Sequence, residues 1–344
     1  MKIRLVLLGT GNVGRQFIKL LQEKGQVLKQ DYALDIKIVG ALDSQGGAAC
    51  EGPDGLDLNV LGSLKTVSDY PNYGRRGLTG EEMIPLSRPD VVLEAGPTNL
   101  ETGEPGLSHA RKAFSNGAHF VTLSKGPVVV ALEELRCLAK PHRLQLKLGG
   151  ATAAALPTTD VALSSLAGAD ITRIEGVLNG TTNYILTRMK EDGIEFQAAL
   201  REAQGKGISE PDPSLDVEGW DTAAKIMVLA NVIMEANVTL EDVSVQGITE
   251  ITQDNMEDAL KQGKTIRLIG EANQSDGRVS VSVYPKYLHG EHPLAQVNDT
   301  VKGICYRTDT LGDVTVIGGK SDPRAAAAAA LKDIITIYRP MGKF

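Results

Sequence analysis

The chain has 344 residues, of which 42% are hydrophobic and 23% are charged, and this length suggests about two domains. Its 36 basic and 43 acidic side chains give a net charge of −7, the wrong sign for a protein that coats nucleic acid or an anionic membrane. No apolar run approaches the ~20 residues that span a bilayer. The sequence therefore argues against a membrane protein and a nucleic-acid partner, and it favours small-molecule partners.

The cysteine content indicates a reducing compartment. Cys50, Cys137 and Cys305 form no C-x-x-C pair and are too few and too scattered for a disulfide framework. The first apolar run enters a glycine-rich stretch where a signal peptide would have a small-residue cleavage site. We therefore expect a cytoplasmic protein.

Strand and helix patterns alternate over the first 150 residues. The apolar run Ile3–Leu8 is followed by a glycine-rich stretch and then by helical spacing over Arg15–Lys24. Further patterns predict strands at Ile36–Leu42, Val91–Ala95, Phe120–Leu123 and Leu144–Leu148, helices at Glu104–Ser115 and Val129–Lys140, and an irregular excursion over residues 44–88. Strands that are apolar throughout and alternate with helices predict an α/β fold, with a Rossmann-type doubly wound parallel sheet covered on both faces.

The glycine-rich stretch predicts a dinucleotide-binding turn. It reads G-x-G-x-x-G, in which the first glycine makes the turn, the second admits a pyrophosphate and the third lets the helix pack on the strand. The positions predicted to contact the cofactor are Gly9, Gly11, Asn12, Val13 and Gly14. The cofactor expected from this pattern is NAD or NADP.

Asp43 ends the second predicted strand, where a carboxylate can bind the hydroxyls of the adenosine ribose. Its separation from Gly14 exceeds the usual ~20 residues, so an elongated first helix and a loop over Gly25–Asp35 must be accommodated. The alternative interpretation is an aspartate that caps a turn. Because a carboxylate repels a 2′-phosphate and Ser44–Cys50 has no Arg or Lys to bind one, we expect a modest preference for NAD.

The pattern changes after Gly149-Gly150, which marks a second domain. The predicted elements are a helix at Asp160–Ala167, a strand at Ile171–Leu178, helices near Asn183–Lys190, Phe196–Gln204 and Val217–Glu235, strands at 265–272, 278–284 and 301–317, and a last helix at Pro323–Tyr338. Polar and apolar residues alternate along these strands, as expected when one face of a sheet is exposed to solvent. This pattern is typical of a mixed or antiparallel sheet packed against helices. We therefore predict one domain from residues 1–150 with 305–344, which binds the dinucleotide, and an α+β domain from residues 151–304.

Asp221 and Lys225 lie four residues apart, so they share one face of a predicted helix. A surface ion pair worth ~0.3–0.5 kcal/mol is the simpler interpretation. The helix, however, continues as Ile226-Met-Val-Leu-Ala, which is apolar nearly all round, so we expect the pair in or beside a buried region. A buried lysine at such a place is a candidate proton donor.

The most specific pattern in the chain runs from Ala203 to Lys225. It contains an Asp-Pro pair and then Asp, Gly, Asp and Lys at the spacing of the homoserine dehydrogenase signature, which it resembles at every constrained position. The resemblance extends to Gly9–Gly14, Thr122–Lys125, Asn179–Ile185 and Gly318–Asp333. It implies a short, monofunctional member of that family without a C-terminal regulatory domain. Such an enzyme interconverts L-homoserine and L-aspartate 4-semialdehyde by hydride exchange with NAD(P), in threonine, methionine and isoleucine biosynthesis.

The resemblance also implies roles for individual residues. Lys225 corresponds to the proton-transferring lysine, Asp221 to the carboxylate beside it, and Lys125 to a lysine between nicotinamide and substrate. The implied substrate-binding residues are Glu210, Asp216, Asp221, Gly180 and Thr181, and the further cofactor-contacting residues are Thr98, Lys125, Gly207, Gly318 and Gly319. Domain 151–304 is then expected to bind substrate and to build the interface of a homodimer.

Two positions depart from the family pattern. Gly149 stands where the family often has a glutamate that helps to hold a sodium ion. The carbonyls of Thr152, Ala154 and Leu156 remain as candidate ligands for Na⁺ or K⁺, but without the carboxylate the attraction is weaker. Ile208 stands where many members have a tyrosine, so one hydroxyl on the substrate side is lost.

Two alternative functions remain open at this stage. One is a related NAD(P)-dependent dehydrogenase that acts on another small hydroxy acid or semialdehyde. Glu210 and Asp216 argue against a substrate without an amino group, because two carboxylates would repel an anion that carries no cation. The other is a dinucleotide sensor with a dead catalytic site, against which the intact Lys125, Asp221 and Lys225 argue.

Overall fold

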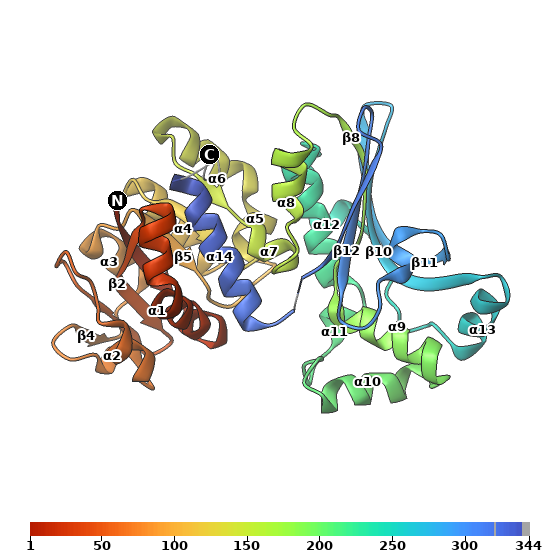
Figure 1. Cartoon of the computed structure of the whole chain (residues 1–344), viewed down its shortest axis with the longest axis horizontal. Helices are drawn as coiled ribbons and strands as arrows, with labels where there is room; N and C mark the ends of the chain where they lie inside the picture. Colours follow the sequence, from red (N-terminus) through yellow and green to blue (C-terminus); the bar gives the residue numbers. More distant parts are fainter. Residues whose placement is uncertain (320, 339–344) are drawn as a thin grey trace. The chain divides into compact units, whose positions relative to one another are not determined.

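The computed structural model describes residues 1–319 and 321–338, which form two compact units (Figure 1). Unit 1 comprises Met1–Ala151 and the chain from Asp322 onward, and unit 2 comprises Thr152–Ser321. The predicted return at residue 305 is wrong, since residues 305–321 belong to unit 2. The physical reason is strand pairing: β12 (Lys302–Thr308) pairs with β13 (Asp313–Gly318) and with β8 (Ile171–Val177), and the alternation of a strand does not reveal which sheet it joins.

Within the described residues, sheet A of unit 1 has the strand order β4-β3-β2-β1-β5-β6-β7. Its strands are β1 (Lys2–Leu8), β2 (Asp35–Asp43), β3 (Gly46–Ala49), β4 (Gly74–Arg76), β5 (Val91–Glu94), β6 (His119–Thr122) and β7 (Leu146–Lys147). The neighbours from β2 across to β7 are parallel, whereas β3 and β4 extend the sheet in antiparallel fashion. The parallel part confirms the predicted α/β fold class.

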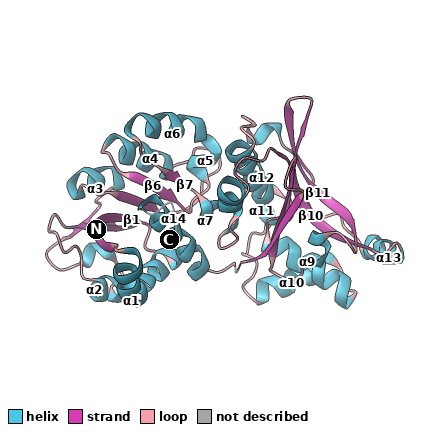
Figure 2. Cartoon of the chain, turned by 45° about the horizontal axis from the view of Figure 1, so that its top comes forward, coloured by secondary structure: helices cyan, strands magenta, loops and turns pink. Residues whose placement is uncertain are grey.

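Helices cover sheet A on both faces, as Figure 2 shows for the strands of unit 1. In β1, Leu5 and Leu7 belong to one buried core, which also includes Phe17, whereas Val6 and Leu8 belong to another. The first core involves α1 (Asn12–Tyr32), α2 (Leu58–Ser63) and α14 (Pro323–Tyr338), and the second involves α3 (Gly80–Ser87), α4 (Gly106–Ser115) and α6 (Leu132–Ala139). This burial on both sides explains why the strand reads as a continuous apolar run.

Three local predictions need correction. Residues 44–88 are not an irregular excursion, because they contain β3, α2, the short helix η1 (Val67–Asp69), β4 and α3. The small and polar residues of β3 and β4 give no strand signal, and only the pairing of these segments beside β2 makes them strands. The expected loop over Gly25–Asp35 is mostly helix, since α1 runs to Tyr32. The predicted helix Val129–Lys140 is divided among α5 (Gly126–Val130), α6 and η2 (Lys140–His142).

Sheet B of unit 2 has the order β13-β12-β8-β10-β11-β9 within the described residues. Its other strands are β9 (Ser244–Val245), β10 (Lys264–Ser275) and β11 (Arg278–His289), and only the pair β9 and β11 is parallel. Helix α7 (Gly149–Ala153) begins in unit 1 and ends in unit 2. The other elements of unit 2 are α8 (Thr158–Asp160), η3 (Val161–Ser165), α9 (Gly180–Asp192), α10 (Phe196–Gly205), α11 (Ser214–Val217), α12 (Trp220–Ile233), η4 (Leu240–Asp242), α13 (Gln253–Lys261) and η5 (Pro293–Gln296).

Helix α12 packs closely on sheet B. A Cβ atom at Gly270 of β10 would lie 3.0 Å from side-chain atoms of both Thr222 and Ile226 on α12. The near-continuous apolar surface of α12 is therefore buried, and its polar side chains Asp221 and Lys225 are held at a fixed place beside the sheet. Among the described residues, no helix has both the length and the apolar character needed to cross a membrane.

Candidate functional site

The turn between β1 and α1 has the geometry of a phosphate-binding loop. Gly9 has a φ of 97°, and a Cβ there would lie 2.6 Å from the backbone of Ala95. A Cβ on Gly14 would lie 2.1 Å from the carbonyl oxygen of Gly9, so helix and loop touch there. At Gly11, by contrast, a Cβ would meet nothing within 4 Å. Open space thus adjoins the N-terminus of α1, where backbone N–H groups favour an anion.

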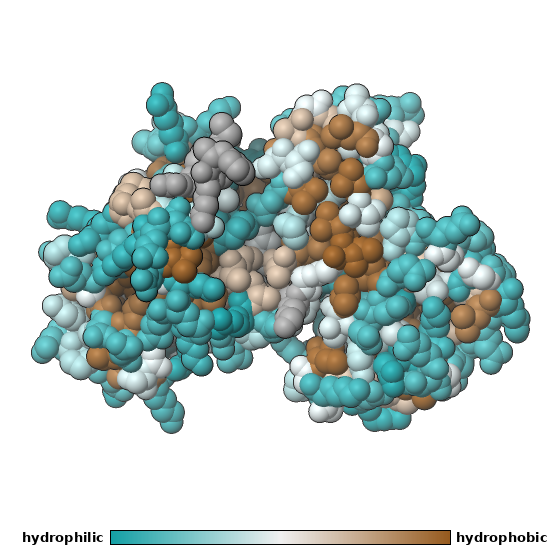
Figure 3. All heavy atoms as spheres, in the orientation of Figure 1, coloured by the Kyte–Doolittle hydropathy of each residue, from teal (hydrophilic) through white to brown (hydrophobic). Residues whose placement is uncertain are grey.

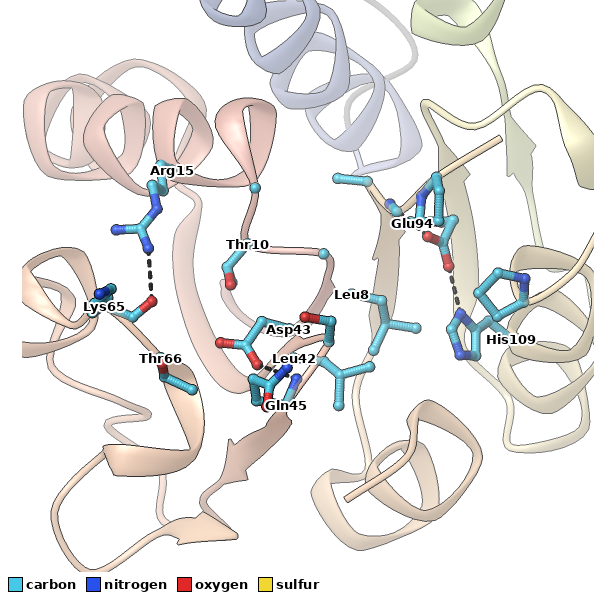
Figure 4. Close-up of a pocket in the computed structure, with 17 residues that line it drawn as sticks. Leu8, Thr10, Arg15, Leu42, Asp43, Gln45, Lys65, Thr66, Glu94 and His109 are labelled. Carbon is cyan, nitrogen blue, oxygen red and sulfur yellow. Dashed lines mark hydrogen bonds and ion pairs between the residues drawn. The ribbon is translucent and has the colours of Figure 1, made fainter. Parts of the chain in front are cut away.

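A cavity of about 580 Å³ adjoins this turn (Figure 4). Its lining includes Gly9, Thr10, Gly11, Arg15, Asp43, Ser44, Lys65, Thr66, Glu94 and His109. The Asp43 carboxylate accepts hydrogen bonds from the backbone N–H of Gln45 at 2.8 Å and of Val67 at 2.7 Å. The two interpretations of Asp43 are therefore compatible, because it caps two loop segments and also faces the cavity. Its contact with a ribose stays a prediction.

Two cations share this end of the cavity. The Arg15 guanidinium donates to the carbonyl oxygens of Leu64 and Lys65, at 3.1 Å each, and Lys65 lies beside it in the lining. Neither cation belongs to Ser44–Cys50, the segment that follows Asp43. Arg15 comes from α1, and Lys65 comes from the segment that follows α2.

A buried carboxylate and imidazole line the other end of the same cavity. Glu94 ends β5 and is 1% exposed, His109 lies on α4 and is 5% exposed, and their Oε2 and Nδ1 atoms are 2.6 Å apart. The other Glu94 oxygen accepts from the backbone N–H of Gly96 at 2.7 Å. Sequence analysis missed this pair. A carboxylate at the end of an apolar strand was a signal for Glu94, but nothing in the local pattern pointed to His109.

The structure brings Thr98 and Lys125 together. The Thr98 hydroxyl accepts a hydrogen bond from the backbone N–H of Lys125 at 3.3 Å and lies 3.4 Å from the Ser124 hydroxyl. Ser124 in turn donates to the carbonyl oxygen of Pro97 at 3.1 Å. These contacts join the loops that follow β5 and β6, so Lys125 is placed at the carboxyl edge of sheet A at the start of α5. Its role in catalysis stays a prediction.

Unit 2 contains a second cavity, of about 410 Å³. Its lining residues are Asn179, Gly180, Thr181, Gly207, Ile208, Asp216, Asp221, Lys225, Thr300, Lys302 and Ser321. The Lys225 ammonium donates to the Asp221 carboxylate at 2.5 Å and to the Leu178 carbonyl oxygen at 3.0 Å. The Lys225 and Asp221 side chains are 11% and 13% exposed, so this is a partly buried pair at a cavity and not a solvated surface pair.

Asn179 connects the acidic residues of this cavity. Its amide nitrogen donates to Asp216 at 2.6 Å and to Asp221 at 2.7 Å, while its amide oxygen accepts from the Thr182 N–H and caps α9. The Asp216 and Asp221 carboxylates thus both face the amide nitrogen of Asn179, and the Lys225 ammonium also donates to Asp221. Sequence analysis placed Asn179 in a matching segment but gave it no role, because its function depends on two carboxylates about 40 residues away.

The remaining predicted residues are divided between the units. Gly180, Thr181 and Gly207 line the unit 2 cavity, and the Thr181 hydroxyl donates to the Ile208 carbonyl oxygen at 3.2 Å. The Glu210 side chain is exposed and outside that lining. Asn12 and Val13 form the first turn of α1. Gly318 and Gly319 lie at the end of β13, with φ values of 140° and 74°, and line neither cavity.

The segment predicted to bind Na⁺ or K⁺ does not fit a cation well. Gly149 supplies no carboxylate, and the Leu156 carbonyl oxygen already accepts from the Thr158 N–H at 2.8 Å. The Lys302 ammonium donates to the Ala153 carbonyl oxygen at 3.3 Å, so a positive charge is already present. Within the described residues, no cluster of three or more His, Cys, Asp or Glu side chains is arranged to hold a metal ion.

Comparisons with known proteins agree on one family. The family model "Homoserine dehydrogenase" matches residues 157–335. The homoserine dehydrogenase of Methanocaldococcus jannaschii is 40% identical over 98% of this chain and 99% of its own length. The NAD(+)-dependent homoserine dehydrogenase of Pseudomonas canavaninivorans is 36% identical over 98% and 96%. The solved homoserine dehydrogenase of Thermoplasma acidophilum has a TM-score of 0.83 at 25% identity, covering 98% of this chain and 99% of that one.

Proposed function

The chain belongs to the homoserine dehydrogenase family, and on that premise we propose how its two units divide the work of the reaction. This NAD(P)-dependent reaction oxidises the CH–OH group of L-homoserine or, in reverse, reduces L-aspartate 4-semialdehyde, a step of threonine, methionine and isoleucine biosynthesis. Unit 1 binds the dinucleotide and unit 2 binds the amino-acid substrate.

The unit 1 cavity fits a dinucleotide. The open space at Gly11 and the start of α1 accept the pyrophosphate, and Asp43 accepts a hydrogen bond from the adenosine ribose. A nicotinamide cofactor held by these residues would supply the hydride chemistry of the reaction. NAD is preferred modestly because Asp43 repels a 2′-phosphate, while Arg15 and Lys65 at the same end of the cavity leave NADP as a weaker cofactor.

The unit 2 cavity recognises the substrate by charge. Asp216 and Asp221 together attract the α-ammonium of homoserine, because Asn179 holds both carboxylates at one place and leaves further lone pairs on each. Lys225 and Lys302 balance these two charges in the lining, so an amino acid that carries one charge of each sign fits there without a net penalty. Thr181 supplies a hydroxyl to the same cavity.

The observation that carries this proposal is the placement of Lys225. Its ammonium donates to a carbonyl oxygen and to Asp221, and Lys225 lines a cavity whose volume of about 410 Å³ accommodates a small substrate. Lys225 gives a proton to the developing alkoxide during aldehyde reduction and takes it back during homoserine oxidation. Lys125 stabilises the charge on that oxygen from the carboxyl edge of sheet A.

The test is an initial-rate assay that follows the absorbance of the reduced nicotinamide. The purified chain should oxidise L-homoserine with NAD and reduce L-aspartate 4-semialdehyde with NADH, and both rates should be lower with the phosphorylated cofactors. A protein that binds NAD but turns over neither substrate would contradict the proposal and would support a dinucleotide sensor.

We also propose a homodimer formed through sheet B, whose open face carries balanced charges. Glu175 and Glu271 lie opposite each other on β8 and β10, and both are bridged by Arg173 and by Lys286. On the visible side of unit 2, hydrophobic side chains gather near β12 (Figure 3), and Ile317 is exposed on the edge strand β13. A second copy that covers this surface meets apolar groups and no net charge.

Light scattering after size exclusion should give twice the chain mass, and a monomer at micromolar concentration would contradict the proposal.

A further inference from the structure

Lys302 fixes the segment that follows α7. It is the first residue of β12, it is 5% exposed, and its ammonium donates to the Ala153 carbonyl oxygen at 3.3 Å. Four residues along the same strand, and on the same face, the buried Tyr306 hydroxyl donates to the Thr158 carbonyl oxygen at 2.8 Å. Burial raises the pKa of Tyr306, which keeps the phenol a neutral donor. One strand therefore holds both ends of the segment from Ala153 to Thr158.

The backbone between these two anchors is tightly folded. Ala154 has a φ of 53°, in the left-handed region, and the Ala153 carbonyl oxygen also accepts from the Leu156 N–H at 3.2 Å. Gly319 approaches this turn so closely that a Cβ there would lie 2.7 Å from the Leu156 nitrogen. The Ala153 carbonyl oxygen thus has two donors, the Leu156 N–H inside the turn and the Lys302 ammonium from β12, as a buried carbonyl group requires.

The residues near Gly149 favour a lysine ammonium over a free Na⁺ or K⁺ ion as the partner of the Ala153 carbonyl oxygen. A Cβ at Gly149 would lie 3.1 Å from the Lys332 ammonium nitrogen and 3.2 Å from both carboxylate oxygens of the buried Asp333. A glutamate at position 149 would therefore meet another carboxylate. The Asp333 carboxylate already pairs with the Lys332 ammonium and accepts from the Gly149 N–H at 3.1 Å, so its charge is balanced within the chain. The Ala153 carbonyl oxygen already accepts a hydrogen bond from the Lys302 ammonium, and this positive charge repels a second cation at short range.

We propose that the Lys302 ammonium is a built-in monovalent cation, which holds the segment from Thr152 to Leu156 in place of Na⁺ or K⁺. Because Lys302 also lines the cavity with Lys225 and Asp221, the charge that orders this segment is part of the substrate-binding wall. The folded state and the activity are then independent of alkali ions. Free alkali ions gain influence only when the ammonium is removed.

The experiment compares chloride salts of sodium, potassium and tetramethylammonium at equal ionic strength, with protein dialysed free of alkali ions. For the unaltered chain, Tm should agree within about 1 °C across the three salts, and kcat/KM for homoserine should agree within about twofold. A Tm or kcat/KM that depends strongly on Na⁺ or K⁺ would overturn the proposal. The Tm readout needs no catalysis, so it stays decisive even if the proposed reaction is wrong.

Substitutions at Lys302 make the test specific. Lys302→Ala should lower Tm by roughly 3–8 °C in tetramethylammonium chloride, because the Ala153 carbonyl loses its charged donor. Methylammonium chloride, whose cation fits the vacated space, should restore part of that loss, whereas tetramethylammonium is too large. Lys302→Arg keeps a cationic donor and covers the case in which the alanine variant does not fold, and its Tm should again be the same in all three salts.

Lys190, a partly buried lysine of unit 2, is the matched control. Lys190 donates to the Thr265 hydroxyl at 3.0 Å and does not line the cavity. Lys190→Met should lower Tm without any rescue by methylammonium. If Lys302→Ala shows no loss of Tm, or if methylammonium rescues both variants equally, Lys302 does not act as the cation of the segment.

Discussion

Lys225→Met removes the proposed proton donor while it keeps the length and the apolar stem of the side chain. The substitution deletes two hydrogen bonds, to the Leu178 carbonyl oxygen and to the Asp221 carboxylate. Asp221 keeps the Asn179 amide as a donor at 2.7 Å, so its charge is not left without a partner. We therefore expect a loss of stability of ~1–3 kcal/mol, which a domain of ordinary stability tolerates.

The kinetic effect should be much larger than this structural effect. A positioned general acid contributes ~10²–10⁴-fold to the rate, which corresponds to ~3–5 kcal/mol of barrier. A structural ion pair between residues four apart predicts instead a stability change of ~0.3–0.5 kcal/mol and an unchanged kcat. The two interpretations differ by at least about two orders of magnitude in kcat, so one measurement separates them.

The assay is kcat for homoserine oxidation, with the NAD dissociation constant and Tm measured on the same sample. NAD binding should be almost unchanged, because the residues that fit a dinucleotide lie in unit 1. Lys261→Met is the control, since Lys261 is an exposed lysine with Glu257 four residues before it and lines neither cavity. A folded Lys225→Met protein that retains more than about a tenth of the kcat would refute the role of Lys225.

Three further predictions follow from named contacts. Asp221→Asn should lower kcat less than Lys225→Met, because the amide still accepts a hydrogen bond from Lys225 but no longer attracts a cation; a kcat equal to that of Lys225→Met would argue against this ranking. Lys65→Ala should lower kcat/KM with NADP by several-fold and leave NAD use nearly unchanged, and an equal loss with both cofactors would show that Lys65 does not face a 2′-phosphate. Burial opposes ionisation of Glu271, but hydrogen bonds from Lys286, Arg173 and Tyr284 outweigh it and hold its pKa below the ordinary 4.5. The stability contributed by this carboxylate is present above pH 4.5 and is lost as the pH falls through the lowered pKa, so Glu271→Gln should flatten the acid limb of a plot of Tm against pH; an unchanged limb would contradict the assignment.

The parts of the fold that could be predicted are those in which a local pattern has one physical explanation. Gly9 and Gly14 are required where a Cβ would collide with backbone, and β1 is apolar throughout because both of its faces are buried. Asp221 and Lys225 could be paired because four residues make one turn and the helix is apolar elsewhere. Each of these inferences needs only the residues within about one helix turn or one strand.

The parts that sequence reasoning missed depend on partners that are distant in the chain. Asn179 has a role only because Asp216 and Asp221 both approach its amide, and Lys65 reaches the Asp43 cavity from a separate loop. Residues 301–317 alternate like any half-exposed strand, so the sheet that they join is decided by the pairing of β12 with β8 and not by their composition. Lys302 likewise becomes informative only when its contact with Ala153 is seen.

The most direct test of the central claim is the ratio of kcat/KM for L-homoserine to that for 4-hydroxybutyrate, its analogue without the amino group, with NAD as the cofactor. If Asp216 and Asp221 bind the α-ammonium, loss of that group leaves two carboxylates facing an anion, and homoserine should be favoured by at least about 100-fold. Equal use of the two compounds, or a preference for 4-hydroxybutyrate, would contradict the assignment of the unit 2 cavity as the amino-acid site.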